Sequence, residues 1–298
     1  MSKTVYIIVG PTAVGKTALA IQLAKYLQTE IISADARQCY KELTIGVARP
    51  SKEELEQVPH HFIASHSIHE TVNAAVFEQY ALAITEKIFQ NKDHIVMVGG
   101  TGLYIKAFCE GLDDIPTIDP SIRSAIVQSY EANGLLWLQN EIAKKDPKYW
   151  EQAEQENPQR LMRALEVIEG LGKSILSFQN QQKKIRPFNI VTLGLEMDRA
   201  LLYERINLRV DQMIAAGLEK EVQQLLPDFE LNALQTVGYR EWLPYFSKEH
   251  SVEQVISAIQ QNTRHYAKRQ MTWFKKDPSI QWFNTENPDL LKAIIDKI

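Results

Sequence analysis

A glycine-rich turn near the N-terminus constrains the fold of this chain more than any other feature. Residues 10–17 read Gly-Pro-Thr-Ala-Val-Gly-Lys-Thr, which fits the pattern G-x-x-x-x-G-K-T. The apolar, β-branched run Thr4–Val9 precedes the turn, and a helical pattern follows it from Gly15 to Gln28. A phosphate-binding loop needs this place between a strand and a helix, because backbone N–H groups and the positive end of the helix then converge on phosphate oxygens. We therefore expect a bound di- or triphosphate.

The side chains of this loop have separate expected roles. Lys16 supplies a full positive charge, and the Thr17 hydroxyl is a candidate ligand for Mg²⁺. The whole motif is predicted to bind the phosphate compound, through Gly10, Pro11, Thr12, Ala13, Val14, Gly15, Lys16 and Thr17. Because many kinases share such a loop, the motif identifies neither the phosphate compound nor the bond that breaks.

Strands that alternate with helices along the chain predict a parallel sheet. Further strands are expected at 30–35, 94–98 and 190–195, and helices at 74–89 and 252–275. From Asp119 to about Gln182 the periodicity is helical throughout, and a helix is expected to begin at Asn157-Pro158. We predict an α/β fold with a P-loop NTPase-like parallel sheet core, formed by residues 1–112 and 188–298. A helical domain is expected to be inserted at 113–187.

Composition limits the classes of protein to which the chain can belong. Hydrophobic residues make up 45% and charged residues 23% of the 298 residues, and no apolar run is long enough to span a membrane. With only two cysteines, Cys39 and Cys109, neither a disulfide framework nor a cysteine zinc finger is expected. The first residues lack a signal-peptide pattern, so we expect a cytoplasmic protein with no membrane partner. The net charge of −4 argues weakly against nucleic acid, although local patches decide such binding.

Two further segments are expected at the carboxyl edge of the sheet, which faces the ligand crevice in open α/β folds. Asp35 ends the predicted strand at 30–35, and Gly99-Gly100-Thr101-Gly102 follows the one at 94–98. From the residues alone, Asp35 is a general base, a Mg²⁺ ligand or a turn residue bonded to the backbone that follows it. The glycine segment is either a tight turn or a site in which Thr101 accepts a hydrogen bond from a base amine.

Arginines and aromatic residues form patterns that suit a polyanionic partner. Arg205 and Arg209 lie four residues apart on a predicted helix, either as a pair that closes on a diphosphate or as a solvated charged face. Residues 264–276 carry five basic residues and no acid, interleaved with aromatic residues. This segment fits RNA phosphate contact and base stacking, or a helix with a buried aromatic face and a basic surface.

Together these segments resemble the bacterial-type tRNA dimethylallyltransferase (tRNA isopentenyltransferase) family. The resemblance is collinear along nearly the whole chain, and the matching segments are 10–17, 33–40, 45–50, 98–104, 157–167, 237–241 and 268–274. The runs Gly-Gly-Thr-Gly-Leu-Tyr and Gln-Arg-Leu-x-Arg-Ala-Leu-Glu-Val are far more specific to this family than the phosphate loop.

The resemblance implies transfer of the dimethylallyl group from dimethylallyl diphosphate to N6 of the adenosine 3′-adjacent to the anticodon, tRNA position 37, with release of diphosphate. Mg²⁺ is the implied cofactor, the tRNA anticodon stem-loop is the implied partner, and we expect a monomer. Asp35 is implied as the general base, Thr101 as the residue holding the amine, and Arg209 as a diphosphate ligand. The implied tRNA contacts are Asp35, Ala36, Arg37, Gln38, Thr101, Arg123, Gln159, Arg160, Leu161, Met162 and Arg163.

Four positions depart from the family pattern. Val47 and Leu171 stand where Thr is common, Arg49 where Lys is common, and Cys39 where an apolar residue is common. They concern local substrate contacts and remove no residue assigned to chemistry.

Two other functions fit parts of the sequence. A P-loop small-molecule kinase using ATP needs only the phosphate motif, and it explains neither the basic segment at 264–276 nor the arginines of the insertion. A nucleotide-gated RNA-binding protein needs no chemistry. Whether ATP binds is left open by the sequence.

Overall fold

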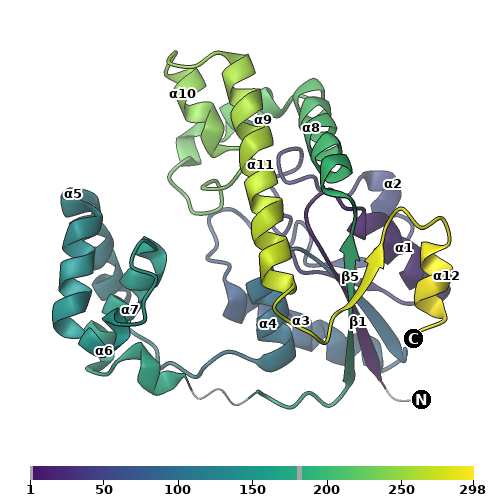
Figure 1. Cartoon of the computed structure of the whole chain (residues 1–298), viewed down its shortest axis with the longest axis horizontal. Coiled ribbons are helices and arrows are strands. Elements are labelled where there is room, and N and C mark those ends of the chain that lie inside the picture. The colour runs from purple at the N-terminus through teal and green to yellow at the C-terminus, as the bar shows by residue number, and fades with distance from the viewer. Residues whose placement is uncertain (1–2, 180–182) are drawn as a thin grey trace. The chain divides into compact units, whose positions relative to one another are not determined.

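The chain divides into two compact units in a computed structural model that describes residues 3–179 and 183–298. The first unit comprises residues 1–111 and 185–298, and the second comprises residues 112–184 (Figure 1). The end of the stretch expected to be helical, residues 180–182, lies outside the described residues. Within the described chain, no helix is both long and apolar enough to cross a membrane.

A parallel sheet forms the centre of the first unit. Among the described residues it has six strands in the order β3-β2-β4-β1-β5-β6, and each pairing is parallel. The strands are β1 (Thr4–Val9), β2 (Ile31–Ser33), β3 (His60–His61), β4 (His94–Val98), β5 (Asn189–Glu196) and β6 (Gln281–Asn284). The predicted α/β fold with a P-loop-like parallel sheet is thus confirmed. The strand expected at 30–35 is shorter than predicted, and β3 and β6 were not predicted because these edge strands, of two and four residues, are too short to show a strand pattern.

Helices cover the sheet and carry the loops at its carboxyl edge. They are α1 (Lys16–Tyr26), α2 (Lys52–Leu55), α3 (Ala74–Phe89), α4 (Gly102–Glu110), α8 (Arg199–Ala215), α9 (Leu218–Gln224), α10 (Leu243–Phe246), α11 (Val252–Phe274) and α12 (Leu290–Ile295). Short 3-10 turns, η2 (Leu226–Asp228) and η3 (Arg240–Trp242), connect the later helices. Polar caps begin α3 and α11, where Asn73 accepts from two backbone N–H groups and Ser251 forms a capping box with Gln254.

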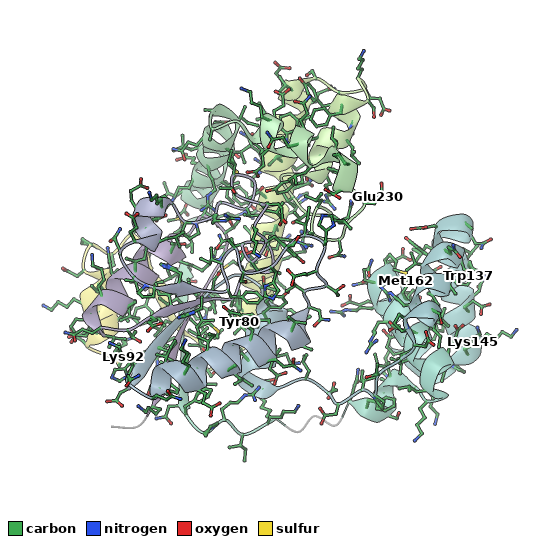
Figure 2. The ribbon with its side chains drawn as sticks, turned by 180° about the vertical axis from the view of Figure 1, so that it is seen from behind. Tyr80, Lys92, Trp137, Lys145, Met162 and Glu230 are labelled. Carbon is green, nitrogen blue, oxygen red and sulfur yellow. The ribbon has the colours of Figure 1, made fainter. Side chains whose placement is uncertain are left out.

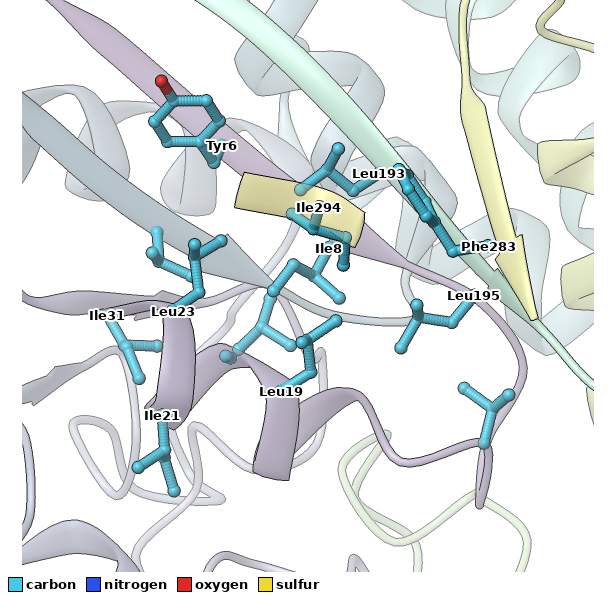
Figure 3. Packing of buried hydrophobic residues seen from close by; sticks show 14 of the residues in the cluster. Tyr6, Ile8, Leu19, Ile21, Leu23, Ile31, Leu193, Leu195, Phe283 and Ile294 are labelled. Atoms are coloured by element: carbon cyan, nitrogen blue, oxygen red, sulfur yellow. The ribbon is translucent and has the colours of Figure 1, made fainter. Parts of the chain in front are cut away.

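The core of the first unit fixes the position of the phosphate loop. Alternate residues of β1, among them Tyr6 and Ile8, pack with Leu19 and Leu23 of α1 and with Ile294 of α12 (Figure 3). All six residues of β1 are buried, as expected for a central parallel strand covered on both faces. The phosphate loop therefore follows a strand that is buried along its whole length.

The second unit is helical and has its own core. It contains α5 (Pro120–Lys145), α6 (Pro147–Trp150), α7 (Pro158–Leu171) and the 3-10 turn η1 (Ile175–Phe178). The predicted helix start at Asn157-Pro158 is confirmed, since the Asn157 side chain accepts a hydrogen bond from the Arg160 N–H at 3.3 Å. Met162 of α7 and Trp137 of α5, both labelled in Figure 2, belong to one apolar cluster with buried Leu138.

One arginine ties together the two ends of the first unit that lead into the second. Arg186 precedes β5, and its Nε donates to the Phe108 carbonyl at 2.7 Å. Its Nη2 donates to the Ala107 carbonyl at 2.9 Å and to Glu78 Oε1 at 2.7 Å. The Arg186 and Glu78 side chains are only 10% and 12% exposed, so this is a buried ion pair. Ala107 and Phe108 lie near the end of α4, just before the chain enters the second unit.

We predict that Arg186→Met destabilises the protein by about 3–5 kcal/mol, because Glu78 is left as a buried carboxylate without its partner. Urea denaturation followed by circular dichroism measures the change. Lys184→Met is the matched control, since the Lys184–Asp114 pair is exposed and should contribute less than about 1 kcal/mol. Equal stability of the two variants would contradict the assignment of Arg186 as an anchor.

Candidate active site at the phosphate loop

The phosphate loop joins β1 to α1 in the geometry that the motif requires. Gly10 has φ 146°, and a Cβ added there would lie 2.6 Å from the Leu195 carbonyl oxygen, so only glycine fits. Pro11 and Val14 are buried and hold the loop against the core. The remaining loop residues, Thr12, Ala13, Gly15, Lys16 and Thr17, line a cavity of about 370 Å³. Of the motif, these five residues can meet a ligand in that cavity.

Lys16 is a buried cation that faces its own loop. Its Nζ donates to the carbonyl oxygens of Gly10 at 3.0 Å and of Pro11 at 2.7 Å. Burial, and to a smaller extent the charge of Arg209, lower the pKa of Lys16, while Asp35 opposes both effects, and the resulting pKa is about 7. An anion bound in the cavity would supply the counter-charge that the surroundings of Lys16 lack.

The predicted arginine pair reaches the same cavity from α8. Arg209 Nη1 donates to the Thr12 hydroxyl at 3.0 Å. Burial, with the nearby charge of Arg205, lowers the pKa of Arg209. Of this arginine pair, Arg209 is hydrogen-bonded to the loop. Arg205 lies beside the cavity and is exposed to solvent.

Asp35 follows β2 and forms a turn with one of its two carboxylate oxygens. Its Oδ1 accepts from the backbone N–H groups of Arg37 at 2.9 Å and Gln38 at 3.2 Å. Within the described chain no hydrogen bond engages Oδ2, and the side chain lines the cavity of the phosphate loop. The turn interpretation is thus correct for Oδ1, and it leaves Oδ2 available for a proton or a metal ion.

Thr101 lies next to Asp35 because parallel pairing brings the ends of β2 and β4 together. The Thr101 hydroxyl accepts from the Ala36 N–H at 3.0 Å, and the Thr101 N–H donates to the Ala34 carbonyl at 3.3 Å. The side chain of Tyr266, from α11, lies close to Thr101. Burial raises the pKa of Tyr266, as does the charge of Asp35, so its phenol stays protonated. The hydroxyl of Thr101 is therefore held in one place.

A second cavity of about 120 Å³ adjoins the first. The residues that line both are Thr12, Asp35, Val47, Ala48 and Arg209. Its further walls include the apolar side chains of Val210, Met213, Val237 and Ile259, along with Arg37 and Tyr266. A polar cavity at the phosphate loop and a more apolar cavity thus share a boundary at Asp35.

The loop at residues 45–48 forms a wall of both cavities and is fixed by side chains to which the sequence assigned no role. Glu221 of α9 accepts from the N–H groups of Ile45 at 2.8 Å and Gly46 at 3.0 Å, and from the Tyr239 hydroxyl at 2.6 Å. Gln38, expected to contact tRNA, donates from Nε2 to the carbonyls of Val47 at 3.2 Å and Ala48 at 3.0 Å. Its amide therefore also supports this wall. The only sequence signal for Glu221 was its place on a helix near the arginine pair.

The departures from the family pattern have different structural settings. Arg49 Nη2 donates to the carbonyls of Tyr40, Lys41 and Leu43, so it fixes the preceding loop instead of facing a ligand. Cys39 is fully buried, and burial raises the pKa of its thiol to about 12, with Asp35 adding to the effect. Val47 lines both cavities, and Leu171 ends α7 before Gly172.

The residues expected to contact tRNA from the insertion form a charged cluster on the second unit. Arg123 Nη2 donates to Gln159 Oε1 at 3.0 Å. Arg123 and Arg163 pair with Glu166 at 3.5 Å and 2.8 Å, and Arg160 pairs with Glu154 at 2.7 Å. Leu161 and Met162, predicted in the same set, are buried in the helical core. Their side chains support α7 and do not face solvent.

The basic and aromatic segment at 264–276 combines both interpretations given to it. On α11, Ala267, Gln270 and Phe274 are buried. The exposed side chains of the segment line an open groove, formed by His265, Lys268, Arg269, Thr272, Trp273 and Lys276. Trp273 is 39% exposed, so one aromatic ring is accessible on this basic surface.

The donors in the first cavity suit a hard divalent cation. The Thr17 hydroxyl and the Asp35 carboxylate both line it, and oxygen donors are the ligands that Mg²⁺ prefers. The described residues contain no cluster of three or more His, Cys, Asp or Glu side chains placed to hold a metal ion. A cation here would thus take most of its ligands from phosphate and water, as is usual for Mg²⁺ at phosphate loops.

The fold and the site define a P-loop α/β protein in which a phosphate cradle lies beside a carboxylate and a hydroxyl at neighbouring strand ends. The chain belongs to the IPP transferase family, whose model matches residues 38–277. A tRNA dimethylallyltransferase of Christiangramia forsetii is 49% identical over 298 residues, which cover 100% of this chain and 98% of that protein. The predicted family is therefore confirmed.

Solved structures agree with this assignment. The full-length tRNA isopentenylpyrophosphate transferase of Bacillus halodurans is 34% identical, with a TM-score of 0.73 and coverage of 100% of this chain and 95% of that one. A eukaryotic dimethylallyltransferase, solved in snapshots of its action on tRNA, is 26% identical with a TM-score of 0.82. That match covers 99% of this chain and 78% of the eukaryotic chain.

We predict that Lys16→Ala weakens binding of inorganic diphosphate by about 10- to 100-fold, because a hydrogen bond to a charged group contributes about 1.5–3 kcal/mol. Isothermal titration calorimetry in the presence of Mg²⁺ measures the affinity. Lys25→Ala is the matched control. Lys25 lies on the same helix at an exposed position, where its Nζ donates to Gln57 Oε1 at 3.2 Å. An unchanged affinity in Lys16→Ala would remove the phosphate role of this loop.

Proposed function

We propose that the chain is a tRNA dimethylallyltransferase, which moves a dimethylallyl group from its diphosphate to N6 of the adenosine at tRNA position 37. The observation that carries this proposal is the phosphate loop lying beside Asp35 and Thr101, in a chain of the IPP transferase family. Relatives named for this reaction are similar over their whole length. We also propose that the protein acts as a monomer and in the cytoplasm.

The leaving diphosphate is assigned to the first cavity. As the allylic C–O bond breaks, negative charge gathers on the diphosphate oxygens. Lys16 and Arg209 line that cavity beside the N-terminal end of α1, and preorganised donors of this kind stabilise charge where it develops. Mg²⁺, when bound, neutralises further diphosphate charge, with Thr17 as the protein ligand that we assign to it.

The attacking amine is assigned to the boundary between the two cavities. The adenine must leave the anticodon-loop stack to reach it, as bases do for enzymes that modify them. Thr101 holds the N6 amine, and the hydrogen bond that its hydroxyl accepts from the Ala36 N–H keeps that hydroxyl in place. As the new C–N bond forms and the C–O bond breaks, N6 gives up a proton, which Asp35 Oδ2 accepts as general base. The apolar walls of the second cavity suit the uncharged groups that meet there.

Recognition of tRNA is assigned mainly to the second unit. The side chains of Arg123, Gln159, Arg160 and Arg163 gather on α5 and α7, where they suit contact with the anticodon stem-loop backbone. The segment Asp35–Gln38 of the first unit then flanks the extruded base. A protein with net charge −4 can still bind RNA through a local basic surface, and residues 264–276 carry five Lys and Arg residues and no acid.

The kinase alternative is less well supported. A P-loop kinase commonly holds Mg²⁺ with an acid at the end of a neighbouring strand. Here Gly99-Gly100 follows β4, and the two acids at the end of β5, Glu196 and Asp198, bond to other protein groups. Asp198 caps α8 by accepting from the Ala200 N–H at 2.8 Å, and Glu196 pairs with Lys275 at 2.6 Å.

One assay separates the candidate functions. The protein is incubated with unmodified tRNA and radiolabelled dimethylallyl diphosphate, and in parallel with labelled ATP. Label in tRNA from the first mixture is the expected result. Transfer of phosphate from ATP would support the kinase, and binding of tRNA without either transfer would support an RNA-binding protein.

We predict that Asp35→Asn transfers the prenyl group at least about 100-fold more slowly while binding tRNA normally, because a positioned general base contributes about 10²–10⁴-fold. Asn retains the Oδ1 that accepts from Arg37 and Gln38, so the turn is preserved. Single-turnover rates on the preformed enzyme–tRNA complex measure the effect, with exposed Asp93→Asn as the control.

The Mg²⁺ dependence of the same rates distinguishes the roles of Asp35. Recovery of the Asp35→Asn rate at high Mg²⁺ would identify Asp35 as a metal ligand. A rate equal to that of the wild type at every Mg²⁺ concentration would leave Asp35 only its turn. A slow rate at every concentration is the result that a general base requires.

We predict that tRNA affinity falls steeply with salt, and that Arg160→Ala and Arg163→Ala each lower the slope of log K against log [salt] by roughly one unit. Each change removes one phosphate contact of the second unit. Filter binding between 50 and 200 mM salt, a range over which such contacts change affinity by orders of magnitude, measures the slope. Lys87→Ala on α3 removes an exposed charge of the first unit and should leave it unchanged. If Arg160→Ala and Arg163→Ala give the same slope as Lys87→Ala, this surface of α7 is not part of the interface.

A further inference from the structure

One buried amide links the phosphate loop to the segment that holds Thr101. Gln270 lies on α11, is only 6% exposed, and uses both ends of its side-chain amide. Its Oε1 accepts from the Thr12 N–H at 2.8 Å, and its Nε2 donates to the Gly100 carbonyl at 3.0 Å. A single side chain thus bridges the loops that follow β1 and β4.

Each end of this bridge touches a residue next to the chemistry. Thr12 receives the guanidinium of Arg209 on its hydroxyl, so the Gln270 bond fixes the backbone of the residue that positions this cation. Gly100 directly precedes Thr101, the residue assigned to the substrate amine. The distance between the diphosphate cradle and the amine-holding hydroxyl therefore depends on the length of the Gln270 side chain.

The bridge fits without spare room. A Cβ added to Gly100 would lie 2.1 Å from Gln270 Nε2, so the glycine backbone and the amide are in the closest possible contact. Residues one turn away on the same face of α11 serve the same segment. Tyr266 lies close to Thr101, and a Cβ added to Gly102 would lie 2.1 Å from Trp273 Nε1. The helix is a rigid support for residues 100–102.

We propose that Gln270 is a positioning residue for prenyl transfer, which sets the separation between the diphosphate cradle at Thr12 and the amine-holding site at Thr101. This inference rests on the proposed function. Transfer needs the allylic carbon and N6 at near-attack distance, and a misplacement of about 1 Å can cost about 10²-fold in rate. The side-chain oxygen of Gln270 and its amide nitrogen both bond to protein backbone. Gln270 therefore acts through Thr12 and Thr101 and not on the substrates.

The first test compares Gln270→Met with Gln260→Met. Met fills a similar volume but bonds to neither backbone group, and Gln260 lies on the same helix and donates only to Asp211 at the surface. We expect the single-turnover transfer rate of Gln270→Met to fall by about 30- to 100-fold, with affinities for inorganic diphosphate and tRNA within about threefold of the wild type. Gln260→Met should match the wild type in all three measurements.

Hydrogen exchange reports on the bridge without relying on catalysis. The Thr12 amide should exchange faster in Gln270→Met than in the wild type, while amides of β1 and β4 keep their protection. Equal exchange of Thr12 in both proteins would refute the bridge. This measurement also stands if the wild type fails to prenylate tRNA, an outcome that would refute the proposed function itself.

A double-mutant cycle separates positioning from general destabilisation. Gly100→Ala forces the Gln270 amide out of its place, and Gln270→Ala removes it, so both changes abolish the same link. We expect the double variant to be no slower than the slower single variant. Additive losses of rate in the double variant would overturn the positioning role. So would a wild-type rate in Gln270→Met when the wild type itself is active. A loss of diphosphate affinity equal to the loss of rate would also overturn it.

Discussion

Parallel pairing around the buried strand β1 is the constraint on which the site depends. The pairing of β1 with both β4 and β5 brings the carboxyl ends of these strands to one edge. The pairing of β2 with β4 adds the end of β2 to the same edge. The phosphate loop, Asp35 and Thr101 come from three separate stretches of chain, and nothing in their local sequence brings them together. The sheet does so, because parallel strands direct their carboxyl ends to the same edge of the sheet.

Burial destabilises the positive charge that gathers at the site. Lys16 and Arg209 are drawn into a cavity that also contains Asp35, and burial lowers the pKa of both basic groups. Such a cluster is unfavourable by itself, since the charge of Arg209 lowers the pKa of Lys16 and the charge of Arg205 lowers the pKa of Arg209. A bound diphosphate would relieve this repulsion. The repulsion among these cations therefore favours a highly charged anion at this site.

The sequence predicts those parts of the molecule in which local pattern and tertiary environment agree. The β-branched run of β1, the glycine motif and the capped start of α7 are such places, and each has the structure that its residues indicate. The edge strands β3 and β6 are too short to show a strand pattern and could not be recognised. Pairings such as Glu221 with the Ile45 N–H, or Gln270 with the Thr12 N–H, join residues 176 and 258 positions apart. Sequence pattern contains no information about contacts at that separation.

The anchoring of Arg186 has a consequence for how this architecture can vary. Because Arg186 bonds to the end of α4, the chain leaves and re-enters the first unit at one fixed point. The residues between behave as a closed loop, and each doubling of loop length costs only about 0.6 kcal/mol in closure entropy. A domain attached in this way can grow, shrink or be exchanged with little effect on the sheet. Substrate recognition and bond chemistry can then evolve at separate rates within one polypeptide.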